Sequence, residues 1–301
     1  MTRLSANTTE LRVRLKEIAC DHVYFGVVFT WFEVGRSEFC RAAGTPYADL
    51  ERRGFGSFVT YADARYRRPI PPDSRVQLET TLAAMTRVRF SFVYALFGGG
   101  GTQPLVTGRS DHVMADASGR PRRVPHDFAA ATMPTGELPE AERIDGPDAV
   151  AWAHSLRVRY EETDALRTVY YGNYFAWMEA AWTERLAGGP WDLARTDPQG
   201  RAFPVLSASC RYLAPARYDD LVHIHVGVTP VKRTRVRLDY RFSTVGASCS
   251  DGAILAHGRT VHAVTDGSRV VAVPDDLLEA LGAPTLPTTP VSPIRPAGPR
   301  R

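Results

Sequence analysis

The sequence contains few cysteines and no long apolar run. Its 301 residues include four cysteines, none of which forms a CxxC pair or lies at zinc-finger spacing from a histidine. A disulfide framework or a structural metal therefore has little support, and we expect reduced thiols. No stretch reaches the roughly 18 uninterrupted apolar residues of a membrane span, and the N-terminal segment MTRLSANTTELRVRLKEIAC has no apolar signal core. We expect a cytoplasmic protein that does not associate with membranes.

Charge of one sign is not in large excess either, because the formal net charge is only +4. The basic residues are mostly arginines and they cluster. The clusters are Arg65, Arg67 and Arg68; Arg120, Arg122 and Arg123; and Lys232, Arg233, Arg235 and Arg237. Each cluster alone fits a solvated strand face, but together they favour an anionic partner, such as a phosphorylated cofactor or an acidic protein. No nucleic-acid-binding motif accompanies them, so a nucleic-acid partner is not expected.

The chain repeats itself once. The segment VYFGVVFTWFEVGRSEF at 23–39 aligns without a gap with VYYGNYFAWMEAAWTER at 169–185, so Tyr24 and Tyr170 lie 146 positions apart. This spacing is far longer than the roughly 20–50 residues of a solenoid repeat. Half of the chain is a normal domain size, and an apolar fraction of 44% is ordinary for a globular protein. The sequence is therefore interpreted as a tandem duplication of one domain.

Each unit is predicted to combine one buried helix with antiparallel strands. The run at 174–181 is apolar on almost every face, which predicts a helix buried on all sides. Val27, Val28 and Phe29 favour a strand at the same place in the first unit, but the repeat predicts a helix there too. Helix–strand alternation is absent, so we predict an α+β fold with a long helix against a curved antiparallel sheet. Period-2 patterns place strands at 11–16, 58–66, 75–85, 88–97 and 104–115, and at 156–160, 203–212, 221–230, 235–245 and 253–264.

Composition sets the expected boundaries between the parts of the chain. The two units are predicted at 8–126 and 151–281, and a Pro-, Gly- and acid-rich linker at 127–150. The tail at 282–301 is mostly Pro, Thr, Ala, Gly and Arg, which predicts disorder. Four consecutive glycines at 98–101 predict a hairpin connection, because neither a helix nor a Lys-Ser/Thr pair follows as in a phosphate-binding loop.

A T-D-A-x-x-x-V-Y-Y-G-N-Y turn at 163–174, followed by the aromatic helix, resembles the signature of the hotdog fold and specifically of the 4-hydroxybenzoyl-CoA thioesterase family. Its outline is also similar to that of enediyne polyketide thioesterases. The resemblance implies a double hotdog with an active site between the two units. Only the second unit has the intact motif. The loop of the first unit is one residue shorter and has Ile18 or Ala19 in place of Asp164, with Asp21 and His22 as possible nearby substitutes.

By this resemblance, Asp164 is the catalytic carboxylate, which either attacks the thioester carbonyl or activates a water molecule. Asp also caps local turns, and this structural role is the alternative. Amides at a helix start lack intrahelical partners and lie at the positive end of the helix dipole, so those of Tyr171 and Gly172 are expected to polarise the carbonyl. The resemblance assigns this function to the amide of Tyr171, and Gly172 would let the substrate approach closely. Asn173 would either orient water or cap the helix.

Other polar and aromatic residues receive weaker assignments. Glu33 and Glu179 occupy equivalent positions on apolar helix faces, which favours a structural hydrogen bond or ion pair over catalysis, because the unit without Asp164 also has one. His112 and His262 have apolar neighbours and are expected in the core or on the surface rather than as ligands. Aromatic residues of both helices are expected mainly in the core, with some lining an acyl tunnel. The candidate substrate-binding residues are Arg167, Tyr170, Tyr174 and Trp177.

The resemblance predicts a thioesterase that releases an acyl group from coenzyme A or an acyl carrier protein, with polyketide or other secondary metabolism as the expected setting. No cofactor is expected beyond the coenzyme A or phosphopantetheine that belongs to the substrate, and no metal. The two units would form a pseudo-dimer within one chain, with a homodimer of such chains as a further option, and the first unit would shape the pocket without catalysing. The alternatives are a double-hotdog acyltransferase or dehydratase and a non-catalytic acyl-binding protein.

Overall fold

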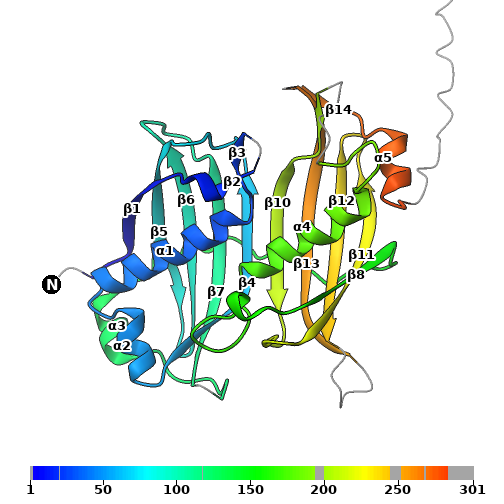
Figure 1. Ribbon diagram of the computed structural model, residues 1–301. Coiled ribbons are helices and arrows are strands. Elements are labelled where there is room, and N and C mark those ends of the chain that lie inside the picture. The colour runs from blue at the N-terminus through cyan, green and yellow to red at the C-terminus, as the bar shows by residue number, and fades with distance from the viewer. Residues whose placement is uncertain are drawn as a thin grey trace, which may run out of the picture.

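The computed structural model describes residues 3–19, 21–116, 118–193, 200–244, 252–267 and 269–283. Its centre is one antiparallel sheet with strand order β1-β5-β6-β7-β4-β10-β13-β12-β11-β8, to which β9 and β14 add by pairing with β13. The two long helices α1 and α4 lie on the same face of this sheet (Figure 1). The tail predicted to be disordered lies outside the described residues from position 284 onward, as do Cys20 and Cys249.

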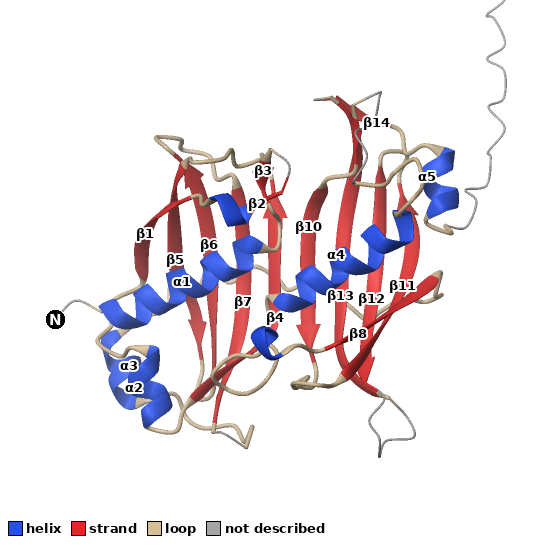
Figure 2. Ribbon diagram, viewed as in Figure 1, coloured by secondary structure: helices blue, strands red, loops and turns tan. Residues whose placement is uncertain are grey.

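The first unit occupies one half of the sheet and carries α1 (Figure 2). Its main elements are β1 (Ala6–Arg12), α1 (Val27–Ala42), α2 (Tyr47–Arg52), β4 (Gly56–Tyr66), β5 (Arg75–Met85), β6 (Arg89–Gly98), β7 (Val106–Ala115) and α3 (His126–Ala131). A 3-10 turn, η1 (Leu15–Glu17), and a two-stranded hairpin of β2 (Ile18–Ala19) and β3 (His22–Val23) precede α1. The hairpin expected at the four glycines is confirmed, because the Gly101 N–H donates to the Gly98 carbonyl between β6 and β7.

The second unit repeats this plan in the other half. Its elements are β8 (Trp152–Arg157), η2 (Tyr160–Glu162), α4 (Asn173–Leu186), β9 (Arg201–Ala202), β10 (Val205–Tyr212), β11 (Leu221–Val231), β12 (Arg235–Thr244), β13 (Ala253–Asp266), β14 (Arg269–Val271) and α5 (Asp275–Ala280). Each unit thus has a strand, a long helix and four antiparallel strands, which confirms the predicted α+β double arrangement. The eight later strands begin and end within two residues of their predicted bounds, except that position 245 is outside the described residues.

The predicted bounds of the two opening strands were wrong, because both strands lie a few residues earlier in the chain. The prediction placed strands at 11–16 and 156–160, whereas β1 ends at Arg12 and β8 ends at Arg157. The chain then turns, because the Glu17 carboxylate accepts the backbone N–H of Arg14 at 2.8 Å. The same contact, 2.7 Å long, closes η2 in the second unit. These capping bonds end the strands although the apolar–basic alternation continues.

Two stretches outside the predicted helices and strands contain short helices. Helix α2 lies in the Gly- and Pro-rich stretch after α1, and α3 covers the first residues of the predicted linker. The reason for α3 is hydrophobic burial, since Phe128 is only 2% exposed and packs against the rings of Phe39 and Phe90. Among the described residues, no helix is long and apolar enough to cross a membrane.

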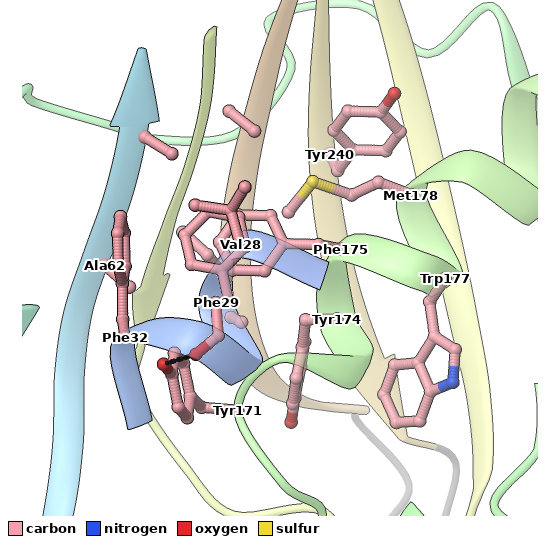
Figure 3. Packing of buried hydrophobic residues seen from close by; sticks show 14 of the residues in the cluster. Val28, Phe29, Phe32, Ala62, Tyr171, Tyr174, Phe175, Trp177, Met178 and Tyr240 are labelled. Atoms are coloured by element: carbon pink, nitrogen blue, oxygen red, sulfur yellow. Dashed lines mark hydrogen bonds between the residues drawn. The ribbon is translucent and has the colours of Figure 1, made fainter. Parts of the chain in front are cut away.

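The two units share one core. Strands β4 and β10 pair antiparallel at the middle of the sheet. Cys210 lies opposite Ala62 in this pair, and both residues are fully buried. In front of them, the rings of Phe29 on α1 and Phe175 on α4 stack with centroids 3.4 Å apart (Figure 3). Because the hydrophobic cluster runs through both units without a break, the second unit's loops are positioned by contacts with the first.

Candidate active site

The Asp164 loop connects η2 to the start of α4. Its two ends are held together by a bridge between Thr163 and Val169, and the backbone N–H of Asp164 donates to the Thr168 carbonyl at 2.9 Å. Inside the loop, Oδ1 of Asp164 accepts the N–H of Leu166 at 2.9 Å. Asp164 therefore does form the local turn that was the structural alternative. This contact uses Oδ1, and the backbone of Thr168 also contributes a hydrogen bond to the carboxyl group.

Electrostatics make Asp164 an unusual carboxyl group. Burial raises its pKa above the ordinary value, and hydrogen bonds from the backbone of Leu166 and Thr168 offset this effect only in part. The negative charge of Glu51 on α2 adds to the increase. No ion pair with a cation compensates the Asp164 carboxylate among the described residues. A half-buried carboxyl of this kind can serve as a base or nucleophile near neutral pH.

The loop also contacts the first unit. The side chain of Leu166 packs on β4, since a Cβ added at Gly56 would lie 3.1 Å from Cδ2 of Leu166. Together with the influence of Glu51, this contact places the candidate carboxylate at the boundary between the two units. Arg167, a predicted substrate-binding residue, is exposed and has a left-handed backbone with φ 58°.

Glu162 is a residue whose importance the sequence analysis missed. Its carboxylate accepts the indole N–H of Trp177 at 2.7 Å, and its backbone carbonyl accepts the N–H of Tyr170 at 2.8 Å. The carbonyl also accepts Nδ2 of Asn173 at 2.8 Å. Glu162 thus connects the strand end, the Asp164 loop and the first turn of α4. The available signal was a glutamate before the helix in both units, because Glu17, 14 positions before Trp31, makes the equivalent contact with Trp31 at 3.1 Å.

The start of α4 presents backbone donors. Gly172 is the N-cap and has no side-chain capping bond, and α4 begins at Asn173. Among the described residues, the amides of Tyr171 and Gly172 have no hydrogen-bond acceptor, and the Tyr171 carbonyl is held by the hydroxyl of Tyr212 at 2.8 Å. Two free N–H groups at the positive end of a helix dipole can bind an oxygen that becomes negative.

Gly172 is required by packing. A Cβ at this position would lie 2.5 Å from the ring of Tyr170, and the equivalent Cβ at Gly26 would lie 2.6 Å from the ring of Tyr24. The tyrosine ring thus folds over the helix start in both units. The Tyr170 hydroxyl continues to the first unit and donates to the Phe29 carbonyl at 3.2 Å.

The remaining predicted site residues of α4 face the core or the preceding turn. Asn173 donates to Glu162 and therefore does not cap the helix. Tyr174 and Trp177 are 2% and 3% exposed, and their ring centroids lie 4.7 Å apart (Figure 3). Both side chains belong to the shared hydrophobic cluster, as expected for most aromatic residues of the helices.

The first unit has the same scaffold without the carboxylate. Ile18 pairs with Val23 as Thr163 bridges to Val169, so Ala19 follows the paired residue as Asp164 does in the second unit. The nearby Asp21 is exposed and accepts a 2.6 Å contact from the ring of His22, which is half-buried.

The acids and histidines that recur in both units have structural contacts. Glu33 accepts a hydrogen bond from the hydroxyl of Ser37 at 2.6 Å. Burial raises the pKa of Glu179, and a hydrogen bond from Tyr24 of the other unit offsets this increase in part. His112 and His262 are 1% and 0% exposed and stack on phenylalanine rings. Of the two places expected for these histidines, core and surface, the structure shows the core.

A groove of about 420 Å³ lies between the linker and the central strands. It is lined by Arg89, Arg143 and Arg211, beside the acidic Asp111 and Glu142. Tyr212, whose hydroxyl holds the Tyr171 carbonyl, is also part of the lining. The groove therefore adjoins the strand that supports the start of α4.

Known proteins are similar to this chain in part of its sequence or in its structure. Acyl-CoA thioester hydrolase YbgC of Escherichia coli O6:H1 is 37% identical over 79 residues, which are 26% of this chain and 59% of that protein. The 12:0-ACP thioesterase of Umbellularia californica has a similar structure, with a TM-score of 0.69, 12% identity and coverage of 86% of this chain and 94% of that one. An acyl-ACP thioesterase of Bacteroides thetaiotaomicron has a TM-score of 0.66, 10% identity and coverage of 85% and 97%.

The two matching structures extend over both units, so the fold is a double hotdog like theirs. The model of the Thioesterase-like superfamily matches the chain twice, at residues 13–132 and 158–281. These two segments contain the two long helices and most of the sheet, and the resemblance noted from the sequence is confirmed. The chain therefore belongs to the Thioesterase-like superfamily as a tandem pair of its domains.

Proposed function

We propose that this protein hydrolyses an acyl thioester of coenzyme A or of an acyl carrier protein, at one site in the second unit. The observation that carries the proposal is the half-buried Asp164 carboxyl with its raised pKa, in the loop that leads to the unpartnered amides of Tyr171 and Gly172. Membership in the superfamily and the activities in the names of YbgC and the two carrier-protein thioesterases support it.

In this proposal, the thioester carbonyl oxygen lies against the amides of Tyr171 and Gly172. These donors stabilise the negative charge that develops on the oxygen when the carbonyl carbon is attacked, an effect worth on the order of 10²–10³ in rate for each donor. They need no reorganisation during the reaction, because the Tyr171 carbonyl is fixed by Tyr212 and the following helix holds the backbone.

The attacking group is Asp164 itself or a water molecule that Asp164 deprotonates. Direct attack forms an anhydride between Asp164 and the acyl group, expels the thiolate, and is completed by water. In the general-base route, Asp164 takes one proton from water while the hydroxide oxygen bonds to the carbonyl carbon. Both routes need the ionised carboxylate and yield a free acid and a thiol.

The remaining assignments concern the ends of the substrate. Tyr170, Tyr174 and Trp177 are proposed to contact the acyl group, and Arg167 the carrier end. The arginines of the groove near Tyr212 suit the phosphates of coenzyme A as well as the acidic surface of a carrier protein. A role in polyketide or other secondary metabolism stays a prediction.

The test is free-thiol release from a panel of short, long and aromatic acyl-CoA thioesters, followed by the same acyl groups on a carrier protein. Turnover of any member supports the proposal, and the preferred carrier identifies the substrate class. If no thioester of either kind releases thiol, hydrolysis is wrong. Acyl transfer to an added acceptor, or acyl-group binding without turnover, then becomes the better description.

A further inference from the structure

The first unit contains a buried charge without a counter-ion among the described residues. Arg36 on α1 is 4% exposed, yet it forms no ion pair with a carboxylate among the described residues. Its guanidinium donates to the phenol hydroxyls of Tyr94 at 3.2 Å and Tyr171 at 3.3 Å, and the Tyr47 phenol is a further neutral neighbour. The Nε of Arg36 is buried without a partner. Burying a cation with only neutral partners costs free energy, so such a residue is a candidate for a functional role.

Arg36 reaches the proposed oxyanion-binding residue across the boundary of the units. Its guanidinium lies 5.2 Å from the ring centroid of Tyr171 as well as within hydrogen-bond distance of the hydroxyl. The same hydroxyl donates to the Phe29 carbonyl on α1 at 2.5 Å (Figure 3). The backbone of Tyr171 belongs to the second unit's helix start, and its ring contacts Tyr170 and Tyr212 of the same unit, but its hydroxyl bonds to Arg36 and Phe29 of the first unit.

A chain of hydrogen bonds supports Arg36 from the other side. The Tyr94 hydroxyl is 2.6 Å from Oγ of Ser110, which is 2.7 Å from Nε2 of His112. The other ring nitrogen of His112 is 3.0 Å from Oγ of Ser57 on β4. Burial, together with the positive charge of Arg36, lowers the pKa of His112, so the imidazole is neutral. A neutral imidazole adds no second positive charge near Arg36.

The second unit shows that the fold does not need this charge. Its network keeps the same pattern, because the Tyr240 hydroxyl is 3.0 Å from Oγ1 of Thr260, which is 2.9 Å from Nε2 of His262.

The residues that differ between the units are the arginine and its tyrosine partner. At the repeat spacing of 146, Trp182 replaces Arg36 and Phe25 replaces Tyr171. The arginine and the tyrosine hydroxyl thus occur together, at the helix start that has Asp164, and are both absent from the other one.

We propose that Arg36 is a positioning residue for thioester hydrolysis, which holds the Tyr171 side chain and thereby orients the Tyr171 amide toward the substrate oxygen. The inference rests on the proposed function and assigns to the first unit a part in the reaction beyond shaping the pocket. An amide donor must lie within about 2.7–3.1 Å of the developing oxyanion, so a small rotation at Tyr171 weakens stabilisation of the transition state. Substrate binding by other contacts is unaffected by such a rotation.

The test is a double-mutant cycle on kcat, with the thioester that the native protein hydrolyses. Arg36→Met removes the charge at similar volume, and Tyr171→Phe removes the hydroxyl that Arg36 contacts. Each single variant is expected to lower kcat by roughly ten- to a hundredfold with KM nearly unchanged, as for misplaced catalytic geometry. The double variant is expected to lose no more than the worse single variant, because both changes break one contact. Arg36→Lys, which keeps the charge, is expected to recover part of kcat.

Tyr240→Phe is the matched control, since it removes a buried hydroxyl from the equivalent network that reaches no catalytic helix start. It is expected to reduce thermal stability but leave kcat unchanged. If Arg36→Met does not fold, the inference is tested by comparing kcat of Tyr171→Phe with kcat of Tyr240→Phe. The inference is overturned if the losses are additive, if KM rises instead of kcat falling, or if the control loses as much kcat. A native protein that hydrolyses no thioester overturns the proposed function instead.

Discussion

The rings of Phe29 and Phe175 stack face to face, with centroids 3.4 Å apart and planes 5° from parallel. The two residues are equivalent in the internal repeat and lie in the two long helices. The stack therefore marks the pseudo-two-fold axis that relates the units. Next to it, the Phe29 carbonyl accepts the hydroxyls of Tyr170 and Tyr171, so the same contact region fixes the helix start of the candidate site.

Loss of either ring is expected to destabilise the whole chain. Phe175→Ala and Phe29→Ala should each lower the free energy of unfolding by about 3–5 kcal/mol, as for other buried phenylalanines. The double variant should reveal a coupling of about 0.5–1.5 kcal/mol from the ring contact. Urea unfolding monitored by fluorescence and circular dichroism measures both quantities. Two separate transitions in the native protein, or strictly additive losses, would contradict a core shared by the units.

Glu162 is expected to matter for activity, and Glu17 offers a matched control. Glu162→Ala removes the acceptor of the Trp177 indole and of the Arg159 amide, and Glu17→Ala does the same for Trp31 and Arg14. Each variant should lose about 1–3 kcal/mol of stability. Only Glu162→Ala should also lower kcat, by roughly ten- to a hundredfold, because it opens the capped turn η2 that leads into the Asp164 loop and frees the Trp177 indole. Equal activities for the two variants would show that Glu162 has no role beyond stability.

The buried histidines predict a loss of stability in mild acid. Burial lowers the pKa of His262 to about 4, whereas an unfolded histidine titrates near 6.5. Between these values the unfolded chain binds more protons than the folded one, so stability is complete above about pH 6.5 and is lost as the pH falls toward 4. Melting temperatures of the native protein and His262→Gln across this range measure the effect. A pH slope that does not decrease in the variant would assign the acid sensitivity to other groups.

Asp164 predicts the opposite slope for stability. Because burial raises its pKa in the folded state, the folded chain keeps this proton at a pH where the unfolded chain has released it. The Asp164 carboxyl therefore destabilises the protein increasingly as the pH rises above the ordinary pKa of an aspartate, near 3.9. Asp164→Asn is expected to melt at the same or a higher temperature than the native protein at pH 7, with the difference decreasing in acid. A lower melting temperature of the variant at pH 7 would mean that the charge stabilises the fold.

The sequence predicted the architecture because the repeat compensated for ambiguous local signals. Val27 and Val28 favour a strand by themselves, and only their alignment with the second helix identified α1. The prediction from sequence failed at β1 and β8, because the apolar–basic pattern continues into a capped turn. It also failed at α3, where burial of Phe128 orders the start of a Pro-rich linker.

The candidate site was only partly predictable for a similar reason. Asp164 and the helix start lie within one local motif, so their residue types and order were sufficient. Arg36 could not be connected with Tyr171 in this way, because 135 positions separate them and the contact depends on how the units pack. Glu162 looked like one acidic residue in an acidic stretch until its contacts with Trp177 and Tyr170 were visible.

The central claim is that Asp164 is the catalytic carboxylate of a thioesterase. The most direct test is kcat/KM of the native protein and of Asp164→Asn for the best thioester of the panel, with Asp63→Asn as the control. Burial raises the pKa of Asp63 as well, but this residue lies on β4 and pairs with the Tyr61 hydroxyl. We expect a loss of at least about a hundredfold for Asp164→Asn, in the range of a lost acid or base, and little change for Asp63→Asn. A folded Asp164→Asn variant that retains native activity would contradict the account.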